Sequence, residues 1–378
     1  MDYETLKLVW WLLIGVLLVG FAIMDGHDMG MGVLLPFVGR NDLERRAVIN
    51  TVAPHWDGNQ VWFITAGGAI FAAWPLVYAT AFSGFYWAMM AALWALFFRP
   101  VGFDYRSKIQ NPTWRSTWDW GLFIGGAVPP VIFGVAFGNL LLGVPFQFND
   151  YLMSTYTGSF WALLNPFSLL AGVVSLAMIT TQGANYLMMR TDGDIYRRVR
   201  TASLIFAALT IATFALAGIW VAKGIDGYVI TSAVDPNALP DPLAKTVEMA
   251  KGAWMHNYSQ YAWAMWVPVA ALAALVASIL FSRMHKAGAA FWSSSAACAG
   301  IIGTAGVSMF PFVMPSSTDP RSSLTVYDAV SSHLTLGLML GATVIFMPLI
   351  IFYTSWAYKV MWGKVTTEYI AANDKSVY

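Results

Sequence analysis

The chain has 378 residues, of which 58% are hydrophobic and only 11% are charged, and its formal net charge is +1. Soluble domains are about 25% charged, and no soluble core of this length could bury so much apolar surface, so the composition predicts a polytopic membrane protein. The small net charge argues against a nucleic-acid partner. The single cysteine, Cys298, excludes an intramolecular disulfide and any multi-cysteine metal site.

Windows of about 20 apolar residues divide the chain into nine predicted transmembrane helices. We therefore expect an all-α polytopic membrane protein, with residues 1–378 forming a single integral membrane domain. The weakest boundary lies between the second and third spans, at Trp74-Pro75. The spans are predicted at 7–36, 47–75, 77–99, 119–143, 159–188, 204–222, 261–282, 290–314 and 333–358.

The loops between these spans alternate in basic content. Of the 21 Lys and Arg residues, 16 fall on one set of loops, with Lys375 near the C-terminus among them. By the positive-inside rule this set faces the cytoplasm, which predicts an outside N-terminus and a cytoplasmic C-terminus. The longest outer loop, about 223–259, is rich in X-Pro pairs and is predicted to consist of turns without a domain of its own. The sequence has no Gly-rich phosphate loop with a Lys, which argues against an ATP-driven pump.

The first two spans carry acidic residues at membrane depth. A charged side chain inside a bilayer costs a few kcal/mol or more, and it usually marks an ion or proton route or a partner group. Asp25 and Asp28 in the first span are spaced i, i+3 and so share a helix face. Asp57 in the second span lies within a polar arc that is too wide to face lipid. The other members of that arc are His55, Asn59 and Gln60.

Helix geometry predicts how deep these acids lie. Pro36 is expected to end the first helix, which puts its two acids about 12 and 17 Å from that end. The second helix is expected to begin at Asn41, with Glu44 three residues later in a pattern close to a capping box, which puts Asp57 about 24 Å along it. Pro54 is expected to leave a backbone carbonyl free near the site. Two interpretations stay open: a proton or cation path from the cytoplasm, or hydrogen bonds that only hold helices together.

Other residues suggest further chemistry. The five histidines raise the question of haem ligation, because His and Met hold haem iron in cytochromes. No two of them are expected to face each other across a bundle at the same outer depth, so ligation within this chain is disfavoured. Many of the 18 Trp residues lie at span ends, which is typical of an interfacial belt. Trp62, one helical turn beyond Asn59, is instead a candidate wall of a path beside the polar arc.

Two motifs lie at predicted membrane edges. The stretch 98–106 contains Arg99 and Arg106 and is expected to be a loop held by ion pairs. The stretch 309–317 is expected to be a helix broken by Pro311 and Pro315 at the outer face.

Ten short sequence motifs occur in an order and spacing that is highly specific for one family, although each motif alone has only modest specificity. They are Trp10-Trp11, Asp25 to Gly30, Gly39 to Asp42, Glu44 to Arg46, Ala53 to Trp62, Ala81 to Tyr86, Phe98 to Arg106, Gly138 to Leu141, Gly224 to Tyr228 and Phe310 to Ser317. On these motifs the chain resembles subunit II of cytochrome bd-type quinol oxidases. One departure is His27, where we expect an aromatic residue in the family. Because His titrates near neutral pH, this departure bears on local proton affinity.

The resemblance implies a complex in the bacterial cytoplasmic (inner) membrane that oxidises quinol and reduces O2 to water. Such a complex holds two haem b groups and one haem d, all ligated by the partner, subunit I, in agreement with the missing histidine pair. The implied fold is two four-helix bundles plus one extra helix, which matches nine spans. Small accessory subunits, membrane lipid and, as in some members, a structural quinone in this chain are further expectations.

Within this interpretation the chain itself carries no catalytic residue and no metal ligand. Its acids serve a cytoplasmic proton path, or balance charge beside the haem sites, and O2 reaches the haem through the membrane past Trp62. A cation-coupled secondary transporter and a purely structural scaffold for subunit I are the alternatives. The residues assigned to the proton path are Asp25, Asp28 and Asp57, oriented by His55, Asn59 and Gln60.

Overall fold

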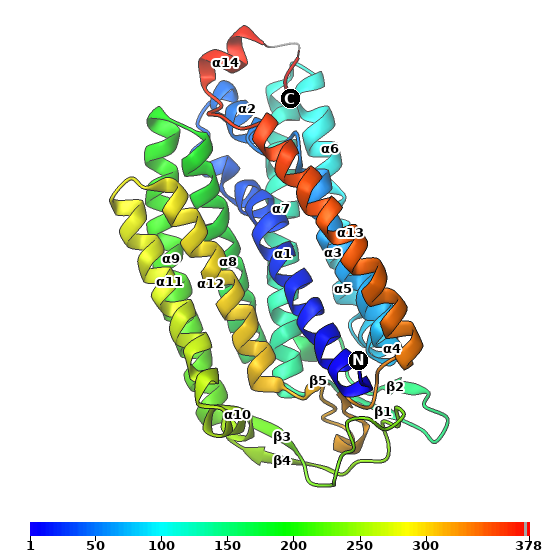
Figure 1. Cartoon of the computed structure of the whole chain (residues 1–378). Helices are drawn as coiled ribbons and strands as arrows, with labels where there is room; N and C mark the ends of the chain where they lie inside the picture. Colours follow the sequence, from blue (N-terminus) through cyan, green and yellow to red (C-terminus); the bar gives the residue numbers. More distant parts are fainter. Residues whose placement is uncertain (374–375) are drawn as a thin grey trace.

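A computed structural model describes residues 1–373 and 376–378 of the chain, so Lys375 lies outside the described residues. Long helices run between two ends of the molecule (Figure 1). We call the end that holds the N-terminus and the short strands the N-terminal end, and the end that holds α2, α14 and the C-terminus the C-terminal end. Because the two termini lie at opposite ends, the chain crosses the bundle an odd number of times.

The helices follow most of the predicted spans. The long ones are α1 (Tyr3–Val38), α3 (Trp56–Ala73), α7 (Pro112–Leu142), α8 (Pro166–Arg190), α9 (Gly193–Gly224), α11 (Trp266–Arg283), α12 (Ala287–Met309) and α13 (His333–Val360). The shorter ones are α2 (Asp42–Asn50), α4 (Pro75–Gly84), α5 (Tyr86–Leu96), α6 (Phe98–Tyr105), α10 (His256–Gln260) and α14 (Thr367–Ala372). Among the described residues, eight helical stretches are long and apolar enough to cross a membrane. α3 has 18 residues and packs along α1, but it is not among these eight, because its first turns are polar.

The prediction that the second span is a single continuous helix is wrong. Asn41 does cap α2, because its side chain accepts a hydrogen bond from the Glu44 amide. However, α2 ends at Asn50, and a turn over residues 51–55 separates it from α3. Pro54 explains the break, since proline has no N–H and its ring clashes with the carbonyl four residues earlier. The depth predicted for Asp57 along one continuous helix therefore does not hold.

Several other boundaries differ from the prediction, among them the starts of α7, α8 and α9, which lie 7 to 11 residues from the predicted ones. α1 continues through Pro36 to Val38. The third span is divided into α4, α5 and α6, and its last part forms a helix over residues 98–105 where a loop was expected. α12 ends at Met309 rather than at 314, which agrees with the expected break at Pro311. The boundary at Trp74-Pro75 is confirmed, with Pro75 as the first residue of α4.

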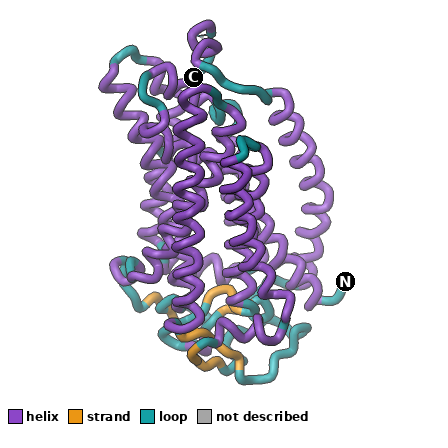
Figure 2. The backbone as a smooth tube through the Cα atoms, turned by 90° about the vertical axis from the view of Figure 1, so that its left-hand side faces the viewer, coloured by secondary structure: helices purple, strands orange, loops and turns teal. Residues whose placement is uncertain are grey.

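The helices form two packed groups. α1 packs against α3, α7 and α8, and α5 and α6 pack against α7. α8, α9, α11 and α12 pack together as the second group. α13 is the extra helix: it stands apart from the rest at the right of Figure 2, and Leu336 is its one buried residue. α1 is the central element, because it contacts both groups.

Small residues allow α1 to approach its neighbours closely. A Cβ atom built on Gly30 would lie 2.4 Å from the Ile179 carbonyl oxygen, and one on Gly183 would lie 2.5 Å from the Gly30 carbonyl carbon. Gly126 in α7 is similarly close to the Met29 carbonyl oxygen, at 2.4 Å. Backbone contacts of this kind are common between transmembrane helices, where small residues let van der Waals packing develop. They fix the α1 segment that carries Asp25 and Asp28.

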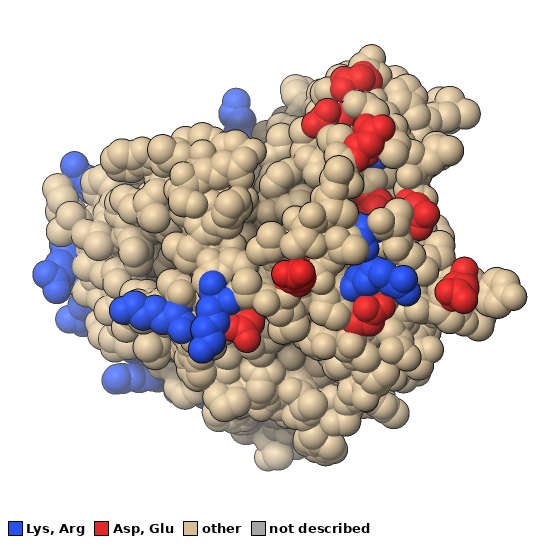
Figure 3. Space-filling view, turned by 90° about the horizontal axis from the view of Figure 1, so that it is seen from below, with Lys and Arg blue, Asp and Glu red and all other residues tan. Residues whose placement is uncertain are grey.

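Three antiparallel hairpins lie at the N-terminal end (Figures 1 and 2). They pair β1 (Phe146–Phe148) with β2 (Ser154–Tyr156), β3 (Asp226–Ile230) with β4 (Val247–Lys251), and β5 (Phe312–Met314) with β6 (Leu324–Thr325). The outer loop at 223–259 thus contains the β3–β4 hairpin as well as turns. Figure 3 views this end, where acidic and basic side chains are scattered over a mostly uncharged surface.

Candidate functional site

The first part of the site is a buried ion pair between α1 and α6. The Asp25 carboxylate accepts hydrogen bonds from both terminal nitrogens of Arg99, one of them at 2.9 Å. Both side chains are almost fully buried. A carboxylate and a guanidinium matched in this bidentate way form one of the strongest ion pairs in proteins. Asp25 is therefore neutralised by a cation that is close in space but 74 residues away in sequence.

The second part of the site surrounds Asp28, one helical turn further along α1. Its Oδ2 atom accepts a hydrogen bond of 2.8 Å from the Asn59 amide in α3. Its Oδ1 atom is buried and has no hydrogen-bond donor among the described residues. The nearest cation-forming group is His27, with Nε2 at 3.3 Å from Oδ1. Burial of a carboxylate without full compensation is costly, so Asp28 is the least satisfied charge in this region.

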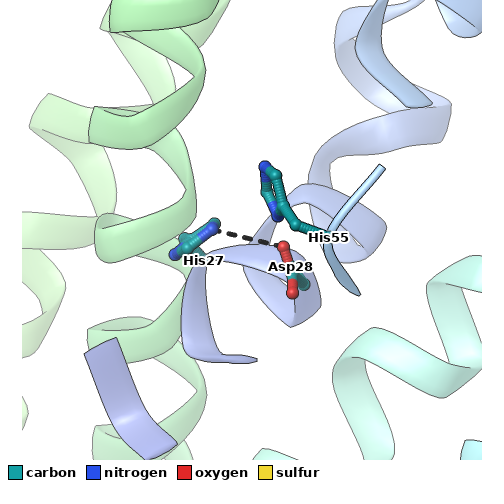
Figure 4. A group of neighbouring side chains, drawn as sticks. All are labelled: His27, Asp28 and His55. Carbon is teal, nitrogen blue, oxygen red and sulfur yellow. Dashed lines mark ion pairs between the residues drawn. The ribbon is translucent and has the colours of Figure 1, made fainter. Parts of the chain in front are cut away.

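Two histidines and two tyrosines complete the cluster. Figure 4 shows His27 and Asp28 projecting from α1 and His55 from the turn before α3. The His27 ring stacks on Tyr186 of α8, with centroids 4.0 Å apart. The His55 ring stacks on Tyr358 of α13, with centroids 4.4 Å apart. These five side chains (Asp28, His27, His55, Tyr186 and Tyr358) and Asn59 are called the buried polar cluster below.

Hydrogen bonds connect the members of this cluster. Asn59 Nδ2 lies 3.2 Å from His55 Nδ1, and Asn59 Oδ1 accepts a hydrogen bond of 2.9 Å from Tyr358. His55 Nε2 lies 2.9 Å from the Tyr186 hydroxyl. That hydroxyl donates to the Thr51 carbonyl at 3.1 Å, which is a backbone carbonyl freed in the turn that contains Pro54. The prediction of a free carbonyl near the site thus agrees with the structure.

The structure does not bring all the predicted residues together. Asp57 lies on the exposed surface of α3 and is not part of the buried polar cluster. Gln60 is half-buried, and no hydrogen bond joins it to the cluster among the described residues. Trp62 is half-buried and packs against Gly20 of α1. The break between α2 and α3 explains this, because it changes the face that α3 presents.

Sequence reasoning missed three members of the site. Arg99 was expected to form an ion pair, but its partner could not be named from sequence. Tyr186 and Tyr358 carry no local signal, since tyrosine in an apolar span usually reflects packing or an interfacial position. Only the packing of α8 and α13 beside α1 places their hydroxyl groups next to the histidines.

Ion pairs also hold the C-terminal end of the same group of helices. Arg106 Nε binds Asp119 at 2.6 Å, and Arg45 binds the same carboxylate at 2.7 Å. Arg106 also contacts Asp42, at 3.0 Å. The expected role of the 98–106 motif in ion pairing is therefore confirmed, although the motif is helical.

The described residues do not fit a haem group within this chain. Haem needs an imidazole nitrogen free to bind iron on the open face of the porphyrin. The structure does bring two histidines together, with the His27 and His55 ring centroids 5.9 Å apart. One nitrogen of each is bonded, His27 Nδ1 to the Ile23 carbonyl and His55 Nε2 to the Tyr186 hydroxyl, each at 2.9 Å. The other two nitrogens lie close to Asp28, between rings that are stacked on tyrosines, and not beside an open space. His27 Nε2 and His55 Nδ1 both lie 3.3 Å from the Tyr358 hydroxyl. The side chains thus fill the space that a porphyrin would need.

Comparison with known proteins identifies the family. The model of the family "Cytochrome bd terminal oxidase subunit II" matches residues 6–361. Cytochrome bd-I ubiquinol oxidase subunit 2 of Escherichia coli (strain K12) is 57% identical over 377 residues, covering 100% of both chains. Cytochrome bd ubiquinol oxidase subunit 2 of Bacillus subtilis (strain 168) is 32% identical, covering 95% of this chain and 96% of that protein.

The fold agrees with this result. A chain of the bd oxidase structure from Geobacillus thermodenitrificans superposes with a TM-score of 0.69 at 15% sequence identity, and the match covers 94% of this chain and 98% of that chain. The family match, the full-length relatives and the fold lead to the same conclusion. The chain belongs to the family of cytochrome bd terminal oxidase subunit II.

Proposed function

We propose that the buried polar cluster of this chain carries protons toward the partner subunit. As a member of its family, the chain is a subunit of a quinol:O2 oxidoreductase that works with a subunit I. Haem bound in the complex supplies the redox chemistry of O2 reduction. We further propose that subunit I ligates two haem b groups and one haem d. Forming water consumes protons, so the complex needs a proton route through apolar helices.

The observation that carries this proposal is the position of Asp28. Its carboxylate is buried, one of its oxygens has no donor, and the other is bonded to Asn59. From Asn59 the hydrogen bonds continue to the half-buried side chains of His55 and Tyr358. A carboxylate connected in this way can accept a proton from one side and release it to another. Buried polar atoms nearly always have a partner, so the unpartnered oxygen is the feature of Asp28 that favours a role beyond joining helices.

The route is proposed to open toward the cytoplasm at the C-terminal end. Asp28 lies ten residues before the end of α1, which is about 15 Å, whereas it lies about 38 Å from the other end. The loops at the C-terminal end carry most of the basic residues, as the positive-inside rule requires for the cytoplasmic side. The chain then has an outside N-terminus and a cytoplasmic C-terminus in the bacterial inner membrane.

Asp25 and Asp57 take different parts in this proposal. The bidentate pair with Arg99 neutralises Asp25 and suits it to charge balance rather than to proton release. Asp57 is exposed at the start of α3, where a proton can reach it from solvent or from the partner interface. Gln60 lies one turn further along α3 and would orient a group that binds there.

Three further expectations remain proposals. O2 would approach past Trp62, which packs against the apolar cluster that contains Phe21. A quinone would be held as a structural ligand in this chain. Small accessory subunits and lipid would cover apolar surfaces such as that of α13.

The test compares Asp28→Asn and Asp57→Asn in the purified complex. Asp104→Asn is the matched control, because Asp104 is an exposed acid on the neighbouring α6. We expect normal haem content in all three variants and a rate of O2 consumption lowered about 100-fold or more in Asp28→Asn. Asp57→Asn should be slowed less, because Asp57 is exposed and solvent can take over its part.

Two outcomes would reject the proposal. Full assembly with unchanged turnover in both Asp28→Asn and Asp57→Asn would leave these acids without a role in proton delivery. Loss of haem in Asp28→Asn, with normal turnover for each haem that remains, would show that the residue supports assembly alone.

A further inference from the structure

The buried polar cluster has more hydrogen-bond acceptors than hydrogen-bond donors. The atoms that face one another are His27 Nε2, Asp28 Oδ1, His55 Nδ1 and the Tyr358 hydroxyl oxygen. Their donors are few: Asn59 Nδ2 reaches His55 Nδ1 at 3.2 Å, and the single Tyr358 proton goes to Asn59 Oδ1. No donor reaches Asp28 Oδ1 among the described residues. A cation placed among these acceptors would compensate the lone pairs that have no donor.

The tautomer of each histidine follows from its other ring nitrogen. His27 Nδ1 lies 2.9 Å from the Ile23 carbonyl, which can only accept, so Nδ1 carries the proton and Nε2 has the lone pair. Tyr186 donates its proton to the Thr51 carbonyl, so it accepts from His55 Nε2, and His55 Nδ1 has the lone pair. Metal-binding histidines almost always donate their second ring N–H to such a partner. Both histidines here are therefore arranged as metal ligands are.

The distances fit a small tetrahedral ion. His27 Nε2 lies 3.3 Å from Asp28 Oδ1 and 3.3 Å from the Tyr358 hydroxyl oxygen, which lies 3.3 Å from His55 Nδ1. The ligand atoms of His27, Asp28 and His55 all lie within 4.8 Å of one another. Zinc bonds of about 2.0–2.1 Å in a tetrahedron put neighbouring ligand atoms about 3.3–3.4 Å apart. Figure 4 shows the three side chains around one common space.

Charge favours the same ion. Asp25 is neutralised by Arg99, whereas no Lys or Arg side chain among the described residues is bonded to Asp28. Two imidazoles and one carboxylate suit Zn²⁺ and related divalent ions better than Mg²⁺ or Ca²⁺, which prefer oxygen ligands. Half-buried His55 and Tyr358 form the side of the cluster nearest the protein surface.

We infer that His27, Asp28 and His55 form a binding site for a divalent transition-metal ion such as Zn²⁺, with the Tyr358 hydroxyl at the fourth position. His27 supplies the second imidazole of this site. The site does not depend on the proposed proton path. Only a slowing of turnover by bound metal would depend on the proposed proton path, because the ion and the proton would then compete for Asp28.

The test uses the purified complex, treated with a chelator and then incubated with Zn²⁺. We compare wild type with His27→Phe, which keeps the ring volume, and with His256→Phe, an exposed histidine in the outer loop. Zinc content after gel filtration and affinity in competition with a chelating dye are measured beside haem content. We expect one more zinc per complex in wild type and in His256→Phe than in His27→Phe. Affinity should fall at least about tenfold in His27→Phe.

X-ray absorption at the zinc edge on the wild-type complex is the second measurement, and it does not require any variant to fold. It should show a shell of nitrogen and oxygen at about 2.0 Å with the scattering pattern of two imidazoles. Equal zinc content and affinity in wild type and His27→Phe, or a zinc spectrum without two imidazoles, would overturn the inference and identify an adventitious ion only.

Discussion

Replacing Arg99 by Met tests the ion pair between α1 and α6. The change removes the cation and leaves the Asp25 carboxylate in a region where Asp25 is 0% and Arg99 2% exposed. Breaking a buried pair in this way costs about 3–5 kcal/mol, because the remaining charge is uncompensated. That is a large part of the 5–15 kcal/mol by which proteins are typically stable. We therefore expect a marked loss of assembled, haem-loaded complex.

A double variant separates the ion pair from the packing of the arginine stem. In Asp25→Leu/Arg99→Met both charges are gone and the helices keep apolar side chains of similar volume. Replacing a buried pair by apolar residues is often neutral or stabilising, so the double variant should recover most of the loss. Arg115→Met is the control, because Arg115 pairs with Asp42 at a half-exposed site, where ion pairs contribute about 0–1 kcal/mol.

The assay is denaturant unfolding of the purified complex, read by tryptophan fluorescence and haem absorbance, together with the yield of haem per milligram of membrane. The reasoning predicts the order Arg115→Met, then the double variant, then Arg99→Met, from smallest to largest loss. If Arg99→Met and the double variant lose equal stability, then the uncompensated charge of Asp25 is not the cause and the argument is refuted.

Three further predictions follow from the packing and from the ends of the bundle. Gly183→Ala should lower the free energy of unfolding by about 1–3 kcal/mol, because the added methyl group meets the backbone of α1. Gly218→Ala is the control, since there is open space around Gly218, and it should not lower the melting temperature. Equal effects of the two variants would contradict the close approach of α8 to α1. Burial raises the pKa of Glu44, but its hydrogen bonds, chiefly to Arg198, lower that pKa by more, so the net pKa is below the ordinary value of 4.5. The contribution of Glu44 to stability is therefore present above pH 4.5 and is lost as the pH falls below it, so Glu44→Gln should melt earlier than wild type at pH 7 and equally at pH 3. Trp254→Phe should lose about 1 kcal/mol, since the indole N–H bonds a backbone carbonyl of α7 at 2.9 Å, and an unchanged melting temperature would show that this bond does not hold the β3–β4 hairpin.

Local signals in the sequence were enough to predict most of the helices. Asn41 with Glu44 correctly predicts the start of α2, and Pro75 the start of α4, because caps and prolines act within one helical turn. The break at 51–55 was missed, since the hydrophobic pattern continues across it and Pro54 could equally have produced a kink. Depth counting along one helix then placed Asp57 wrongly.

The candidate site could be predicted only in part. Asp25 and Asp28 were found because charge in an apolar span is costly wherever it lies. Their partners were not, since Arg99 lies 74 residues from Asp25 and Tyr358 lies 331 from His27. Which side chains meet at such separations depends on how the helices pack, and no periodicity within one helix records that packing.

The exposure of α13 has a consequence for how the cluster is completed. Tyr358, which closes the fourth side of the cluster, belongs to the helix with the least support from its own chain: Leu336 is the one buried residue of α13. Within this chain the hydroxyl is held by its hydrogen bond to Asn59. A contact that shifts α13 would therefore move the hydroxyl relative to His27 and His55, and a label on the outer face of α13 would report on residues that it never touches.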